Sequence, residues 1–206
     1  MNCHGSKRRE FIYANYEIKV VGCIKLYDGA SIESDAGGPK ITDRYYQFTC
    51  KHSSTGKLET IIVGHVVARE ICEECGLAMP KEFNPFYEEA RGGGGGGAAA
   101  TRYDPMRRQL YNAIMLIITR YRLSDKSGTS PIFEILNEVT SDMTMPIEPR
   151  YVKAINTILK KFKPMGEIIQ DLNAVNRVRN FNFNLLVDCL RENGETDVSN
   201  FELIRR

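Results

Sequence analysis

Four potential metal ligands lie at the two ends of one short stretch, residues 50–75. Cys50 and His52 are two residues apart, and on a strand such a pair projects from one face. Cys72 and Cys75 are three residues apart and can converge from a helix face or a knuckle turn. A hairpin folded back over the helix would bring them together as a Cys₃His set. Such a closed tetrahedral set has no open position for water, so the hypothesis is one structural zinc ion and no catalytic centre.

The cysteines also have an interpretation without metal. Six cysteines in 206 residues are too few and too unevenly spread for a disulfide scaffold. In a reducing compartment, such cysteines often serve as small buried apolar groups. On that interpretation the sulfurs belong to the core and His52 is an unrelated surface residue. Both interpretations stay open at the level of sequence.

The same stretch resembles the treble-clef zinc modules, in which a hairpin containing Thr-Gly leads through Val-Gly to a helix that supplies the last ligands. The matching pieces here are Thr55-Gly56, Val63-Gly64 and the helix expected after them. The resemblance covers about thirty residues. It departs directly after the second glycine, where such modules place a cysteine and this chain has His65. It therefore implies either a zinc-bound module or a metal-free version of one.

A second group of residues that could bind a ligand consists of basic residues in the C-terminal half. They are Arg150, Lys153, Lys160 and Lys161, on one expected helix over 149–162, and Arg177 and Arg179 within the segment 176–184. Arg150, Lys153 and Lys160 share roughly one helix face and could follow a phosphate backbone. Phe181 and Phe183 follow the two later arginines and either stack on bases or enter the core. The alternative interpretation is an ordinary solvated face.

An acidic group suggests a different class of function. Glu17 and Lys19, two apart on an expected strand, are similar to half of a metal-dependent nuclease centre. Such a centre needs a further acid, which Asp28 or Asp43 would supply. The alternative function is therefore a metal-dependent nuclease or other hydrolase that uses acids of the N-terminal region. No catalytic residue is assigned, because neither a phosphate-binding glycine loop nor a nucleophile elbow is present.

The bulk composition narrows the class of protein. The chain is 42% hydrophobic and 26% charged with a net charge of +2, as in a soluble globular protein. No apolar run approaches the roughly 18 to 20 residues that cross a bilayer, and no secretion signal is visible. We therefore expect an intracellular protein, cytoplasmic or nuclear, without a membrane partner or a small-molecule cofactor.

A tract of six glycines and three alanines, residues 92–100, divides the chain. Its uniformity is typical of an engineered flexible linker, which either replaces a natural loop or joins two chains. The residues on its two sides, 1–91 and 101–206, show different secondary-structure patterns. The expected domains are an α+β module, possible host of the zinc ion, and a helical region.

Turn and cap signals define the expected elements. Residues 11–29 are rich in Tyr, Ile and Val and predict one bent strand or two strands broken near Gly22. Residues 44–63 predict a hairpin with a positive φ at Gly56, and residues 65–75 predict a short helix ended by Gly76. The N-terminal region is therefore α+β.

The C-terminal region predicts a bundle of four or five helices. Three starts carry a capping residue followed by proline: Asp104-Pro105, Ser130-Pro131 and Glu148-Pro149. Further helices are expected after Pro164, the last of them closed by Gly194.

These features together predict a non-enzymatic binding or adaptor protein. We expect it to act within a protein or protein–nucleic-acid complex. A protein partner is expected, nucleic acid is a second possible partner, and the basic helical region is the surface for it.

Overall fold

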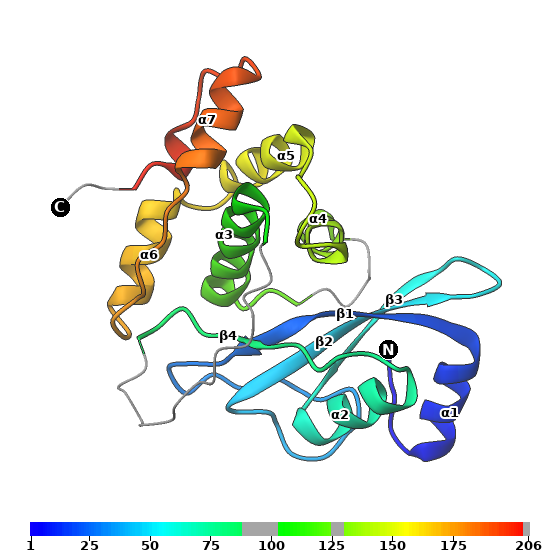
Figure 1. Ribbon diagram of the computed structural model, residues 1–206. Coiled ribbons are helices and arrows are strands. Elements are labelled where there is room, and N and C mark those ends of the chain that lie inside the picture. The colour runs from blue at the N-terminus through cyan, green and yellow to red at the C-terminus, as the bar shows by residue number, and fades with distance from the viewer. Residues whose placement is uncertain (88–102, 125–129, 204–206) are drawn as a thin grey trace. The chain divides into compact units, whose positions relative to one another are not determined.

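The computed structural model describes residues 1–87, 103–124 and 130–203 (Figure 1). Within these residues the chain is mixed α+β, with a four-stranded sheet, seven α-helices and a mostly helical later part. It divides into two compact units, Met1–Asn84 with Leu123–Asn137 and Pro85–Arg122 with Glu138–Arg206. The linker predicted at 92–100 lies outside the described residues, and the domain boundary there stays a prediction.

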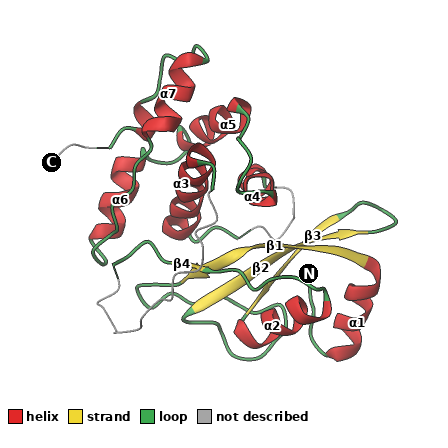
Figure 2. Ribbon diagram, in the orientation of Figure 1, coloured by secondary structure: helices red, strands yellow, loops and turns green. Residues whose placement is uncertain are grey.

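The sheet of the first unit has the strand order β3-β2-β1-β4 (Figure 2). Its strands are β1 (Tyr16–Lys25), β2 (Arg44–His52), β3 (Leu58–Val63) and β4 (Glu82–Phe83). The first three pair antiparallel, and β4 pairs parallel with β1. The pairing register of β1 shifts between Val20 and Gly22. The interruption predicted near Gly22 is therefore a bulge within one strand.

The N-terminal strand prediction is wrong at its start. Residues 6–15 form helix α1 (Ser6–Asn15), and the strand begins only at Tyr16. Aromatic and branched residues at 11–13 favour a strand locally, but only Ile12 of this helix is buried. A strand is stabilised by cross-strand pairs, and the pairing of this segment with β2 begins only at Tyr16.

The hairpin and the helix after it agree with the prediction. Strands β2 and β3 enclose Gly56, whose φ is 68°. Helix α2 (His65–Glu74) follows, and Gly76 just beyond it has a φ of 64°. Both glycines occupy the left-handed region that residues with a Cβ rarely adopt. The predicted turn at Gly56 and the predicted helix end at Gly76 are therefore confirmed.

Helices α1 and α2 cover one face of the sheet, where the core of the first unit lies (Figure 1). This core joins Ile12 of α1, Ile71 of α2 and Phe48 of β2 with other buried apolar side chains from β1 and β3. Phe48 and Ile12 are fully buried. Packing against the two helices therefore fixes which side chains of each strand point inward.

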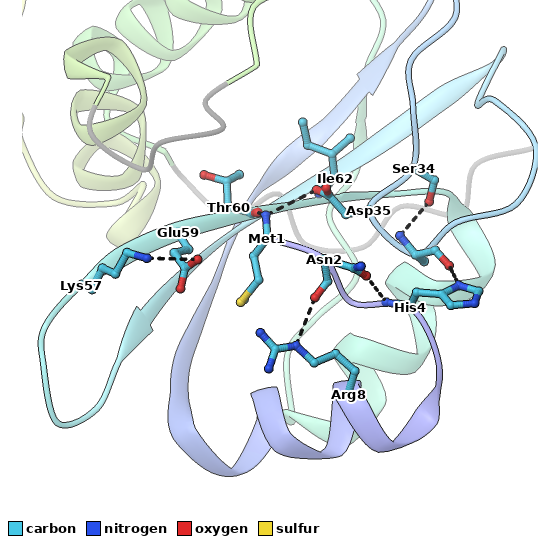
Figure 3. A network of polar contacts seen from close by, with 11 residues as sticks. Met1, Asn2, His4, Arg8, Ser34, Asp35, Lys57, Glu59, Thr60 and Ile62 are labelled. Carbon is cyan, nitrogen blue, oxygen red and sulfur yellow. Dashed lines mark hydrogen bonds and ion pairs between the residues drawn. The ribbon is translucent and has the colours of Figure 1, made fainter.

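The N-terminal residues lie beside β3, an edge strand of the sheet (Figure 3). The amino group of Met1 donates to the carbonyl of Thr60. Asp35 accepts the N–H of Ile62 through its side chain at 2.8 Å, and its own N–H donates to the Ile62 carbonyl at 2.8 Å. The N–H of Cys3 in turn donates to the Asp35 carbonyl at 2.9 Å. These contacts satisfy backbone groups that an edge strand otherwise leaves unpaired.

The second unit is helical, and the proline-led starts are confirmed. They open α3 (Pro105–Tyr121), α4 (Pro131–Ser141), whose first residues belong to the first unit, and α5 (Pro149–Leu159). Asp104 caps α3 by accepting the N–H of Arg107 at 2.7 Å. The helices α6 (Met165–Asn173) and α7 (Asn184–Glu192) and the 3₁₀ helix η1 (Ser199–Phe201) follow.

Helix α3 is the centre of this unit, because its residues 113–119 are all buried. It packs against α6 and α7, and α5 packs against α7. A buried amide chain holds η1 to α5: Asn200 donates to the Asn156 side chain at 3.0 Å, which donates to the Asp197 carbonyl at 3.0 Å. The description of all these helices as one bundle goes beyond these contacts and stays a prediction. None of the described helices is long and apolar enough to cross a membrane.

Candidate functional site

A short two-stranded ribbon carries the candidate site. The N–H of Tyr87 donates to the Arg177 carbonyl at 2.9 Å, and the N–H of Arg179 donates to the Pro85 carbonyl at 2.8 Å. Phe86 and Val178 lie opposite one another in an isolated bridge and are buried. Because side chains alternate along an extended chain, Tyr87, Arg177 and Arg179 fall on the other side, where all three are exposed.

The chain reaches this ribbon directly from α6. The side chain of Asn173, the last residue of α6, accepts the N–H of Val178 at 2.8 Å. The N–H of Arg177 donates to the Asn176 side chain at 2.7 Å. Asparagine side chains that bond nearby backbone groups stabilise turns, and here they fix the position of both arginines relative to α6.

Each arginine is stacked on an aromatic ring. The guanidinium carbon of Arg177 is 4.7 Å from the ring centre of Tyr87, and that of Arg179 is 5.7 Å from the ring centre of Phe181. Phe181 is itself parallel to Phe183, with ring centres 6.4 Å apart. Phe183 is buried and enters the core, whereas Phe181 is half-buried. The aromatic rings thus hold both guanidinium groups in defined places.

These residues line a cavity of about 440 Å³, the arginine–aromatic cavity. Its wall consists of Tyr87, Arg177, Arg179 and Phe181 on one side and of α6 residues, including Ile169, Gln170 and Asn173, on the other. Among the described residues that line it there are two arginines and no aspartate or glutamate. The described lining of the cavity is therefore electropositive and rich in hydrogen-bond donors, which suits an anionic ligand.

The sequence located three of these residues and missed the others. Arg177, Arg179 and Phe181 were selected because they lie close together in the chain. Tyr87 carried no such signal, since it joins the site only through the pairing of segments about ninety residues apart. Gln170 and Asn173 lie nearby on α6, but their residue types alone did not mark them as ligand-binding. The short Pro85–Tyr87 segment has no periodicity that could have predicted this pairing.

The predicted cations on and just after α5 are placed differently. Lys153 donates to the Asn193 carbonyl at 2.8 Å and lies 3.7 Å from Glu195, and Lys160 lies 3.6 Å from Asp197. Arg150 bonds Glu148 at 3.1 Å, and Lys161 is exposed. Three of the four cations therefore already have a carboxylate nearby, and none of the four lines the cavity.

The four predicted zinc ligands do not share one environment. Cys50 and Cys72 are buried in the core of the first unit, and Cys75 packs against it. His52 lies where β2 ends, and its Nδ1 is 3.1 Å from the Ser54 hydroxyl while its ring contacts Tyr16 edge-on at 4.8 Å. Burial raises the pKa of Cys50 to about 12. The structure thus brings the cysteines into one core, with His52 occupied in the hairpin turn.

The zinc hypothesis stays a prediction. Within the described residues, no group of three or more His, Cys, Asp or Glu side chains is arranged to hold a metal ion. The hypothesis requires about one zinc ion per purified chain by elemental analysis, and loss of thermal stability when a chelator removes it. A content below about a tenth of a zinc per chain would reject it. The resemblance to treble-clef modules likewise rests on the sequence alone.

The acids of the proposed hydrolase alternative are far apart. Glu17 lies near the first end of β1 and pairs with Lys19 at 3.1 Å. Asp43 lies at the other end of that strand, where it bonds Arg44 at 2.8 Å and also contacts Lys25. From residue 17 to residue 25 a strand extends roughly 26 Å, at about 3.3 Å per residue. Glu17 and Asp43 are therefore not placed to share a metal ion, and Asp28 follows β1 at the same far end.

Comparison with known proteins yields one match. Residues 1–199 match the family described as Uncharacterised conserved protein UCP028583. The chain belongs to this family. No curated protein and no solved structure matches it. The family description assigns no ligand or activity. The geometry of the arginine–aromatic cavity is therefore the basis for a proposed function.

Proposed function

We propose that the protein is a non-enzymatic binding protein that takes up single-stranded nucleic acid in the arginine–aromatic cavity. The observation that carries the proposal is the pairing of Arg177 and Arg179 in one cavity whose described lining has no carboxylate. Phosphate groups are the ligands for which arginine is best suited, because the guanidinium fork donates two parallel hydrogen bonds.

The stacking of both arginines supports this proposal. A ring that lies over a guanidinium covers its face, whereas the N–H donors lie in the guanidinium plane and point outward from its edge. The ring of Tyr87 can therefore hold Arg177 in place without using the donors that a phosphate needs. Less side-chain entropy is then lost when the ligand binds.

The size and chemistry of the cavity favour a single strand over a duplex. A cavity of about 440 Å³ has room for one nucleotide unit, whereas duplex DNA or RNA presents its backbone on a convex cylinder. The amide groups of Gln170, Asn173 and Asn180 also line this cavity and can donate to base or sugar oxygens. The protein partner expected from the sequence stays a prediction beside this proposal.

The proposal is tested by replacing Arg177 and Arg179 together with alanine. We expect binding of a fluorescently labelled ten-nucleotide single strand to weaken about thirtyfold, on the order of 1 kcal/mol for each lost arginine–phosphate contact. The salt dependence should change as well. The slope of log K against log salt should become shallower by about 1.4, since each phosphate contact on a single strand contributes about 0.7. Fluorescence anisotropy across a salt series measures both.

Arg150→Ala is the matched control. Arg150 is also exposed and stacked, with its guanidinium carbon 4.8 Å from the Tyr151 ring centre, but it is bonded to Glu148. We expect this variant to bind within about twofold of the unchanged chain, because exposed ion-paired cations contribute little. Equal losses in the double variant and in the control, or no loss in either, would remove the cavity as the binding site.

A further inference from the structure

A second, acidic cavity adjoins the arginine–aromatic cavity. It has a volume of about 290 Å³ and is lined by Glu167 at the start of α6 and by Ser199 and Glu202 near η1. Gly166 and Leu203 line both cavities, so the two are neighbours on either side of these residues. One cavity therefore offers two cations, and the next offers two carboxylates.

The two carboxylates differ in their existing contacts. Glu202 bonds Arg191 at 3.0 Å. Glu167 is exposed, and within the described part of the chain it forms no ion pair and no side-chain hydrogen bond. An ionised carboxylate accepts hydrogen bonds and donates none. Glu167 is therefore the acceptor in this cavity that a ligand can use.

Charge determines how a nucleotide can lie across the two cavities. The carboxylates repel phosphate, so the phosphate group is confined to the side of Arg177 and Arg179. The base is then directed over Gly166 and the apolar side chains of Ile169 and Leu203, and its edge meets Glu167. In single strands, this Watson–Crick edge is free to be read by hydrogen bonds.

We propose that Glu167 makes the site selective for bases with an exocyclic amino group, an inference that rests on the proposed function. Adenine and cytosine carry amino groups that donate to a carboxylate. Uracil and thymine present carbonyl oxygens on both sides of their single ring N–H, and these oxygens repel it. A base without an amino group offers Glu167 no such donor, so it binds with lower affinity.

The experiment compares labelled A₈, C₈ and U₈ RNA, which carry the same number of phosphates. We expect the unchanged chain to bind A₈ and C₈ about tenfold more tightly than U₈. Glu167→Gln should reduce this ratio to below about threefold, because the glutamine amide can donate to a uracil carbonyl. Glu192→Gln is the control: it removes the same charge from an exposed position on α7 and should leave the ratio unchanged.

The outcomes separate the two proposals. If all three strands bind equally and still depend on Arg177 and Arg179, the selectivity proposal is wrong and the proposed function holds. A ratio that Glu167→Gln leaves unchanged, or that Glu192→Gln lowers equally, also overturns the role of Glu167. If no strand depends on the two arginines, the proposed function itself is wrong.

Discussion

Replacing Arg107 with alanine is expected to lower the free energy of unfolding by about 3 kcal/mol. Arg107 is only 5% exposed, and its guanidinium donates to the carbonyls of Glu138 at 3.0 Å, Val139 at 3.1 Å and Pro146 at 3.2 Å. The first two carbonyls lie in the last turn of α4, where no further helical N–H can reach them. Urea denaturation followed by circular dichroism measures the change.

Most of this loss should come from Val139, whose hydrogen bond with Arg107 is buried, whereas Pro146 is exposed and its carbonyl can bond water. The Glu138 carbonyl also accepts from the Ser141 hydroxyl at 2.8 Å, so it keeps a partner in the variant. An unpaired buried carbonyl costs about 1 to 3 kcal/mol, and the expected loss lies at the upper end of this range because the three hydrogen bonds are lost together.

Two further variants identify the cause of the Arg107 effect. Arg108→Ala changes the neighbouring, exposed arginine of α3 and should alter stability by less than about 0.5 kcal/mol. Arg107→Met keeps an aliphatic stem of similar length but cannot donate, so it should be nearly as unstable as the alanine variant. A methionine variant close to the unchanged chain in stability would show that packing, and not carbonyl capping, is the role of Arg107.

Elements set by local chemistry were predictable from the sequence. Asp104 and Pro105 are adjacent residues, and the hydrogen bond that starts α3 is formed within three residues of Asp104. The turn at Gly56 and the end of α2 at Gly76 likewise depend on one backbone conformation each. In such cases the physical cause lies within a few neighbouring positions, so reading the chain in order is sufficient.

Features set by distant contacts were not predictable in the same way. Residues 11–13 have the composition of a strand, but they belong to α1, and the pairing with β2 begins only at Tyr16. The candidate cavity needs residues 85–87 to pair with residues 177–179, a register that no periodicity reveals.

Phe48 is the position in the first unit where a truncation should have the largest effect. It is fully buried, and β2, its strand, pairs on both sides, with Val20 opposite Phe48 on β1 and Ile61 opposite it on β3. Phe48→Ala is expected to lower the free energy of unfolding by about 3 to 5 kcal/mol, because the side chains from three strands and two helices cannot close the space it leaves. Thermal or urea denaturation measures the loss.

Phe11→Ala is the control that separates burial from residue type. Phe11 lies on α1, one residue before the buried Ile12, and is 46% exposed. Its replacement removes the same atoms but leaves no internal cavity, and alanine has the higher helix propensity, so stability should change by less than about 1 kcal/mol. Because the second half of α1 was predicted as a strand, this pair of variants also tests which face of α1 packs on the sheet. A larger loss for Phe11→Ala than for Phe48→Ala would mean that α1 packs on the sheet through the opposite face, and that the core of the first unit is not the one formed around Phe48.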